Sequence, residues 1–153
     1  MSWKPVVREI EMEIKAYHYT PGPLGLRWLE ALKKGLIMAA SCDRCGYVFI
    51  PPKIYCPRCF SEVTQLVEIK EKPHLASYTV IYKDFEGREL EKPIVLGLIR
   101  FRGVAGGLIH YIEAPIDRIT IGAELEPVFR RDRRGSITDI EFFRISGARS
   151  PND

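Results

Sequence analysis

The feature that most constrains this 153-residue chain is the spacing of its four cysteines. They form two pairs, Cys42-Asp-Arg-Cys45 and Cys56-Pro-Arg-Cys59, with ten residues between the pairs. Each pair turns two sulfurs toward one centre, and two pairs complete a tetrahedral set of four sulfurs that suits Zn²⁺. The spacer is shorter than the usual ~15–20 residues, but a short hairpin can span it. We therefore predict one structural zinc ion, bound by Cys42, Cys45, Cys56 and Cys59.

Two disulfides or four free thiols are the alternative interpretations of these cysteines. The chain opens without an apolar signal segment, because Met1–Lys15 carries charges throughout, and we therefore expect a cytoplasmic protein. In a reducing compartment, paired cysteines indicate a metal or redox site rather than disulfides. A thioredoxin-like redox site needs a βαβ setting, which the sequence does not offer. Four sulfur ligands leave no position for water, so we do not expect the zinc to be catalytic.

Length and composition indicate one domain or two very small ones. The hydrophobic content of 46% is enough for a core. The longest apolar run, Leu36–Ala40, is far shorter than the ~20 residues of a membrane-spanning helix, so we expect no membrane partner. The net charge of +3 is mild and is no general nucleic-acid signature. Most of it is concentrated in one segment, Arg130-Arg-Asp-Arg-Arg134.

Before the first cysteine pair, the sequence predicts a strand and then a helix. Residues Val7–Ala16 alternate between charged and apolar side chains, which is typical of a half-buried strand. Residues Leu24–Lys34 predict a short helix, with Pro23 at its first position and Gly35 at its C-terminal end. We expect Trp28 to be a core residue rather than a ligand platform, because it shares the apolar face of this helix with Leu24, Leu29 and Leu32.

The cysteine pairs lie in a predicted zinc ribbon from about Ala39 to Val63. Between the pairs, Tyr47–Tyr55 alternates and is interrupted at Pro51-Pro52, which predicts two short strands around a turn. Thr64–Lys72 is predicted to be a linker with room for one strand.

From His74 onward, alternation and turn residues indicate β structure throughout. The predicted strands are His74–Tyr82, Ile94–Phe101, Leu108–Glu113, Ala123–Arg130 and Ser136–Ile145. Five short strands, with a longer connection between the third and the fourth, fit a small barrel of the OB type. Pro127 predicts an edge or a bulge in the fourth strand. The predicted fold is mainly β, with an N-terminal strand and helix (1–38), a zinc ribbon and linker (39–72) and an OB-fold (73–148).

Several segments together resemble a known family. They are Tyr17-His-Tyr-Thr-Pro-Gly, Leu24-Gly-Leu-Arg-Trp-Leu-Glu-Ala-Leu, Cys42-x-x-Cys-Gly46, Tyr47-Val-Phe-Ile-Pro-Pro-Lys, Tyr55-Cys-Pro-Arg-Cys59, Ser77-Tyr-Thr-Val-Ile-Tyr82 and Gly122-Ala-Glu-Leu-Glu-Pro-Val-Phe129. The chain resembles the prokaryotic zinc-ribbon plus OB-fold proteins associated with acyl-CoA metabolism, originally described as a domain of unknown function. The resemblance covers roughly Tyr17 to Arg144. In one departure, Phe60 follows the fourth cysteine, where the family often has glycine.

This resemblance implies an N-terminal helical element, a rubredoxin-like ribbon and an OB barrel. It also implies a partnership with thiolases or with 3-hydroxy-3-methylglutaryl-CoA synthase, in which the small protein bridges or completes the larger enzyme and touches the CoA moiety. The expected function is therefore that of a non-catalytic accessory or scaffold protein. The chain agrees with this, since His18, His74 and His110 are isolated and no nucleophile is paired with a base.

Nucleic-acid binding is the alternative function, because zinc ribbons and OB-folds also occur in such proteins. Six aromatic residues are candidates for stacking on bases, although their alternation favours a place in the barrel core. They are Tyr78, Tyr82, Phe85, Phe101, Tyr111 and Phe129. The mild net charge counts against this alternative, because affinity for a nucleic-acid backbone rises with each phosphate neutralised.

The arginine cluster lies in the predicted loop between the fourth and fifth barrel strands. Arginine matches phosphate oxygens with a planar fork of donors, so Arg130, Arg131, Arg133 and Arg134 are candidate ligands for the phosphates of CoA. A solvated turn is the simpler interpretation, since most charged runs are solvated. Contact with a partner protein is a third interpretation of this cluster.

A set of apolar residues outside the barrel also indicates an interface, because a small ribbon cannot bury all of them. They are Trp3, Tyr17, Tyr19, Trp28 and Phe60.

Overall fold

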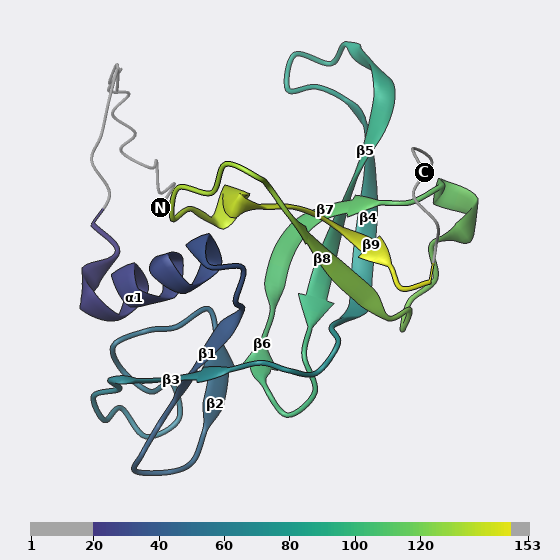
Figure 1. Ribbon diagram of the computed structural model, residues 1–153. Helices are drawn as coiled ribbons and strands as arrows, with labels where there is room; N and C mark the ends of the chain where they lie inside the picture. The colour runs from purple at the N-terminus through teal and green to yellow at the C-terminus, as the bar shows by residue number, and fades with distance from the viewer. Residues whose placement is uncertain (1–19, 148–153) are drawn as a thin grey trace, which may run out of the picture.

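The computed structural model describes residues 20–147, which form two β-sheets and one helix (Figure 1). The predicted mainly β class is confirmed. The strand predicted for Val7–Ala16 lies outside the described residues, as do Trp3, Tyr17 and Tyr19. The helix α1 spans Gly22–Lys33, with Pro23 in its first turn. In the part of the chain that the structure describes, no helix is both long and apolar enough to cross a membrane.

The C-terminal end of α1 is fixed by Gly35, as predicted. Gly35 adopts a positive φ of 79°, and its N–H donates to the carbonyl of Leu32 at 2.8 Å. Trp28 is a core residue, also as predicted, and its indole N–H donates to the carbonyl of Met38 at 2.9 Å. Trp28 therefore does not belong to the exposed apolar residues that we expected outside the barrel. Phe60 does, because 79% of its surface is exposed.

The ribbon sheet contains four short strands in the order β3-β1-β2-β6. Their bounds are β1 Met38–Ser41, β2 Val48–Ile50, β3 Gln65–Glu68 and β6 Ala105–Gly106. The second strand predicted between the cysteine pairs is absent from this region, where only an isolated bridge joins Tyr55 to Glu62. The reason is Pro51-Pro52, because two residues without N–H groups cannot continue a ladder.

The second sheet is the predicted OB barrel. It contains β4 (His74–Lys83), β5 (Glu89–Arg100), β7 (Leu108–Glu113), β8 (Leu125–Phe129) and β9 (Ile140–Ile145), in the order β4-β5-β7-β9-β8. Strands β7 and β9 are parallel, and the other neighbours are antiparallel. The barrel closes where Leu75 at the start of β4 exchanges two backbone hydrogen bonds with Gly122 and Ala123, at 2.7 and 3.0 Å. Pro127 lies in β8, the last strand in the sheet order, and a register shift follows it.

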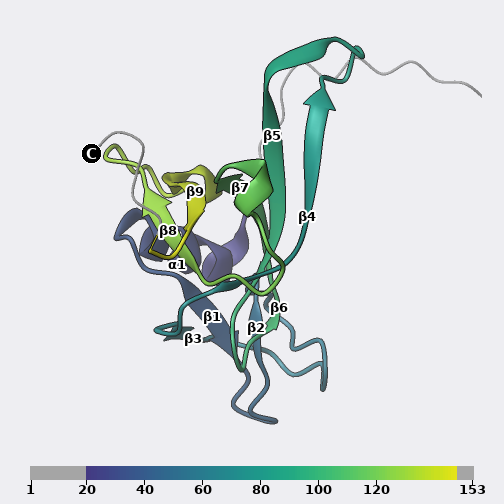
Figure 2. The ribbon, with the colours of Figure 1, turned by 90° about the vertical axis from the view of Figure 1, so that its right-hand side faces the viewer.

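Two of the predicted strand boundaries are wrong. Strand β5 begins at Glu89 rather than Ile94, so β4 and β5 form a long hairpin that projects beyond the barrel (Figure 2). We call residues 81–94 the arm, since Ile81 pairs with Ile94 at its base. The arm misled the prediction because its exposed strands carry charges and Pro93, as loops do. The segment predicted as Ser136–Ile145 begins instead with a 3-10 turn, η2 (Ile137–Asp139), because Ser136 caps it by accepting from the N–H of Thr138. A second turn, η1, spans Ile116–Arg118.

Helix α1 contributes to both hydrophobic cores. Leu24 packs in the ribbon core with Phe49 and Val63. One and two turns later, Trp28 and Leu32 pack in the barrel core, together with Leu75, Ile99, Leu125 and Phe143. Because one amphipathic face is divided in this way, α1 holds the ribbon against one side of the barrel.

The ribbon and the barrel also share backbone hydrogen bonds, through β6. This two-residue strand lies in the glycine-rich loop after β5 and pairs in parallel with β2 of the ribbon. A Cβ at Gly106 would lie 2.1 Å from the carbonyl oxygen of Ile50, so only glycine permits this approach. The N–H of Gly107 then donates to the same oxygen at 3.2 Å. We call this contact the seam.

The expectation that six aromatic residues fill the barrel is wrong for four of them. Phe101 is buried and Phe129 packs against the core. Tyr82 and Phe85 belong to the arm, and Phe85 at its tip is 95% exposed. Tyr78 is also exposed, and Tyr111 lies on the outward face of β7. Tyr82 and Phe85 are exposed because the arm extends past the core, and Tyr111 is exposed because alternation places it on the outward face of β7.

Candidate metal centre

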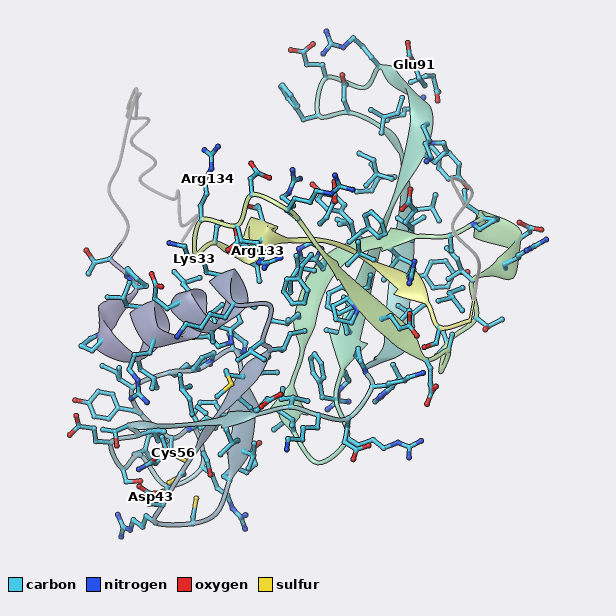
Figure 3. All side chains as sticks on the ribbon, in the orientation of Figure 1. Lys33, Asp43, Cys56, Glu91, Arg133 and Arg134 are labelled. Atoms are coloured by element: carbon cyan, nitrogen blue, oxygen red, sulfur yellow. The ribbon has the colours of Figure 1, made fainter. Side chains whose placement is uncertain are left out.

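The two cysteine pairs adopt the same local structure. In the first, the N–H of Gly46 donates to the carbonyl of Cys42 at 2.8 Å. In the second, the N–H of Phe60 donates to the carbonyl of Cys56 at 2.9 Å. Each pair is therefore a tight turn that directs two sulfurs to one side, and the turn after β1 faces the turn that follows β2. Figure 3 shows Cys56 in the ribbon, in the lower part of the view.

The four sulfurs form a compact set suited to one zinc ion. All four lie within 4.8 Å of one another. The Sγ atoms of Cys42 and Cys59 are 3.6 Å apart, and those of Cys45 and Cys56 are 3.7 Å apart. Tetrahedral Zn–S bonds of about 2.3 Å place sulfurs about 3.8 Å apart, whereas a disulfide needs about 2.05 Å. The predicted structural zinc site is confirmed, and the donor set leaves no open coordination position.

Sequence reasoning missed Ser61, whose hydroxyl lies 3.2 Å from Cys42 Sγ and 3.1 Å from Cys59 Sγ. Hydrogen bonding to this hydroxyl lowers the pKa of Cys42 to about 6 and lowers the pKa of Cys59 as well. For Cys45, a hydrogen bond from the Tyr47 backbone favours the thiolate, but burial and the neighbouring sulfurs outweigh it and raise the pKa to about 12. Ser61 therefore stabilises two of the thiolates that zinc requires. A hydroxyl residue two positions after the last cysteine was the available signal.

Phe60 follows the fourth cysteine, where the resembled family often has glycine, and it adopts the backbone conformation that glycine favours. Its φ is 58°, close to the 67° of Gly46 at the equivalent position of the first pair. The turn geometry is thus preserved, but with a side chain in the left-handed region, which costs L-residues about 1–2 kcal/mol. The Phe60 ring gains little from burial in return, since most of it is exposed. Strain of this kind often marks a functional surface.

Phe60→Gly is expected to raise the free energy of unfolding of the zinc-loaded protein by about 1 kcal/mol, because relief of the left-handed strain exceeds the extra chain entropy of glycine. Thermal or denaturant unfolding measures this. Phe60→Ala is the matched control, since it removes the ring but retains the backbone cost, and it should give no such gain. Equal stabilisation by both substitutions would contradict the strain argument.

The predicted arginine loop lies between β8 and β9, and Asp139 organises it. The Asp139 carboxylate is buried and accepts from the backbone N–H groups of Arg134, Gly135 and Ser136, at 2.9, 2.7 and 3.1 Å. Burial raises the pKa of Asp139, but these three donors and the nearby Arg133 outweigh it, and the pKa is held below its usual value. The loop is therefore a fixed structure rather than a loose turn.

The four arginines do not converge on one point. Arg133 donates to the carbonyl of Lys33 at the end of α1, at 2.7 Å, and to the carbonyl of Arg130 at 2.9 Å (Figure 3). Arg130 donates to the carbonyl of Thr138 at 2.9 Å. Arg131 and Arg134 are exposed, and the guanidinium of Arg134 lies 3.7 Å from Asp132. The loop thus uses two of its arginines internally, where Arg133 also meets the partial negative charge of a helix C-terminus.

A zinc ribbon joined to a five-stranded OB barrel defines the class of this protein, and known sequences match both parts. Residues 29–65 match the ChsH2 rubredoxin-like zinc ribbon domain, and residues 66–130 match the ChsH2 C-terminal OB-fold domain. A DUF35 domain-containing scaffold protein of Methanothermobacter thermautotrophicus is 30% identical over 108 residues, covering 69% of this chain and 80% of that protein. One from Methanocaldococcus jannaschii is 28% identical over 109 residues, covering 68% and 74%.

Solved structures agree with these matches. A DUF35-family protein of unknown function from Sulfolobus solfataricus has a TM-score of 0.65 and 32% identity, covering 81% of this chain and 84% of that one. The Ltp2-ChsH2(DUF35) aldolase has a TM-score of 0.60 at 23% identity, covering 82% and 96%, and supports the fold alone. The chain belongs to the DUF35 family of zinc-ribbon plus OB-fold proteins.

Proposed function

We propose that this protein is a non-catalytic scaffold that assists an acyl-CoA enzyme of the thiolase type in the cytoplasm. The observation that carries the proposal is the match, over most of both chains, to an archaeal protein named as a scaffold. The metal centre supports it, because four sulfurs occupy every position around zinc and leave none for a substrate. A thiolase or 3-hydroxy-3-methylglutaryl-CoA synthase as partner comes from the family resemblance. ChsH2(DUF35), named together with Ltp2 in an aldolase, is a related case.

The surface offers several apolar contacts for a protein partner. Phe60 projects from the ribbon, and Phe85 projects from the tip of the arm. On the outer face of the barrel, Ile109 and Tyr111 are 73% and 50% exposed. Exposed apolar residues that lie on different modules suit a protein that contacts more than one surface of a larger enzyme.

Contact with the CoA moiety is part of the proposal. The arginine loop contributes to it through Arg131 and Arg134, whose side chains are exposed, while Arg130 and Arg133 hold the loop in shape. A guanidinium paired with a phosphate oxygen makes a strong, charge-assisted hydrogen bond.

The test is reconstitution with the thiolase and the 3-hydroxy-3-methylglutaryl-CoA synthase of the source organism. We expect the purified chain to co-elute with one or both in size-exclusion chromatography and to change the stability or turnover of that enzyme. The chain alone should not turn over acetyl-CoA or acetoacetyl-CoA. Turnover that follows the concentration of the purified chain would contradict a non-catalytic role, and separate elution from both enzymes would contradict the partnership.

Nucleic-acid binding stays as the alternative, favoured by the exposure of Tyr78, Tyr82 and Tyr111. Stacking of bases on exposed aromatic rings is a common mode of single-strand binding. The nucleic-acid alternative predicts that pull-downs with this protein recover nuclease-sensitive material. The affinity of the protein for single-stranded nucleic acid should then fall steeply as the salt concentration rises.

A further inference from the structure

A depression of about 390 Å³ lies where the ribbon meets the barrel, next to the seam. The residues that line this depression include none of those predicted from the sequence as site residues. The ribbon contributes Tyr47, which follows the first cysteine pair, and Arg58 from within the second pair. The barrel contributes His74 at the start of β4, Arg100 at the end of β5 and Gly103 from the loop that follows. We call this depression the junction site.

The charges at the junction site are all of one sign. The guanidinium groups of Arg58 and Arg100 line it, and no carboxylate of a described residue does. Among the residues that the structure describes, neither Arg58 nor Arg100 takes part in an ion pair. Positive charge gathered in a depression without an internal counter-ion favours an anionic ligand, and guanidinium forks match phosphate oxygens best.

The walls of the junction site are held in place by the fold. His74 and Arg100 are direct partners in the β4–β5 ladder, and Arg100 Nε donates to the carbonyl of Gly106 at 3.3 Å. The seam at Gly106 also fixes the ribbon wall relative to the barrel wall. The ring of Tyr47 stacks on Phe49, with centroids 6.0 Å apart. An aromatic surface beside two arginines suits a ligand that combines a flat base with phosphate groups.

A neighbouring depression of about 440 Å³ shares His74 but is less suited to an anion. Two carboxylates, of Glu71 and Glu124, line it together with Lys70, Lys72 and Arg102. The ammonium group of Lys72 already lies 3.7 Å from the carboxylate of Glu124 and 3.7 Å from that of Glu126. Carboxylates therefore offset part of the positive charge of this depression, whereas no carboxylate of a described residue lines the junction site.

We propose that the junction site binds the phosphate-bearing end of a nucleotide-type ligand. The proposal rests on the proposed function only in taking CoA as the natural ligand. It concerns the isolated chain, so it does not require a partner enzyme. It makes Arg58 and Arg100 the main phosphate contact and leaves Arg131 and Arg134 of the arginine loop with an accessory one.

The test is calorimetric titration of the full-length, zinc-loaded chain with CoA, with adenosine 3′,5′-bisphosphate and with phosphate-free pantetheine. The double variant Arg58→Gln with Arg100→Gln is expected to weaken binding of the first two by roughly tenfold or more, because each charge-assisted contact contributes that much. Pantetheine should respond little. The matched control is Lys83→Gln with Lys92→Gln, which removes the same charge from the arm, far from the junction site (Figure 1), and should leave the affinity unchanged.

Unchanged affinity in the junction double variant, or an equal loss in the arm control, would overturn the proposal. The proposal would also be overturned if only the double variant Arg131→Ala with Arg134→Ala lost affinity, because the phosphates would then be bound by the arginine loop. Tighter binding of a single-stranded oligonucleotide than of CoA, lost in the junction variant, would replace the small ligand with nucleic acid. Arg100→Gln alone, outside the cysteine pairs, keeps the test decisive if the double variant loses zinc. The titration contains no partner enzyme, so its outcome is independent of the reconstitution experiment that tests the proposed function.

Discussion

Cys56→Ser is expected to lower bound zinc from one ion per chain to a small fraction and to unfold the ribbon. Cys56 is fully buried and contributes to the ribbon core as well as to the metal set. A structural zinc of this kind contributes about 10–16 kcal/mol to the folding of small domains, more than the few apolar residues of the ribbon can replace. Elemental analysis measures the zinc, and amide NMR spectra locate the unfolding. Chelation of the wild-type protein should give the same pattern.

The barrel should survive the loss of zinc, at least in part, because it has a core of its own around Leu75, Ile99 and Phe143. Ser61→Ala is the matched control, since it retains all four sulfurs and removes only the hydroxyl. It should bind zinc fully but release it to a chelator roughly 10–100-fold faster, as expected when a supporting hydrogen bond to a ligand is lost. Full zinc content in a variant that lacks all four cysteines would contradict the assignment of these cysteines as the zinc ligands.

Asp139→Ala is expected to lower the free energy of unfolding by about 2–3 kcal/mol, since it leaves three partly buried backbone N–H groups without their acceptor. Asp139→Asn should cost less, because one carbonyl oxygen remains. Denaturant unfolding at neutral pH measures both. Asp132→Asn is the control in the same loop, and its exposed pairing with Arg134 predicts a change within about 0.5 kcal/mol.

The effect of Asp139 should depend on pH. The pKa of Asp139 is lowered in the folded protein, so its contribution to stability is present above the pKa of the unfolded chain, about 3.9. That contribution is lost as the pH falls through the lower pKa of the folded state. The stability difference between wild type and Asp139→Asn should therefore be constant near neutrality and shrink below about pH 4. A difference that persists at low pH would show that the loop depends on packing rather than on the carboxylate.

The zinc ligands, the helix and the barrel strands could be predicted from sequence because each depends on local spacing. Two Cys-x-x-Cys pairs define a metal site whatever surrounds them, and Leu108–Glu113 alternates strictly because one face of β7 is buried. Alternation of apolar and polar residues does not predict a strand where that strand extends beyond the hydrophobic core. In the arm, β5 continues to Glu89 through charged residues, because its partner is β4 rather than a hydrophobic layer.

The rest of the candidate site depends on residues that are distant in sequence. Arg133 reaches the carbonyl of Lys33, 100 positions earlier in the chain, and nothing in the run of arginines indicates that partner. Ser61 contacts Cys42 across 19 positions. The junction site requires the ribbon and the barrel to be docked, and that docking depends on Gly106, which the sequence shows only as one of several glycines in a loop.

The seam at Gly106 has a mechanical consequence. A backbone ladder between the ribbon and the barrel, reinforced by a helix whose side chains enter both cores, leaves no hinge between the two modules. Anything that binds the ribbon at Phe60 is thereby set at a constant distance and angle from anything that binds the barrel. We therefore expect the ribbon and the barrel to move as one unit, and an insertion at the seam should uncouple the two ends while each module still folds.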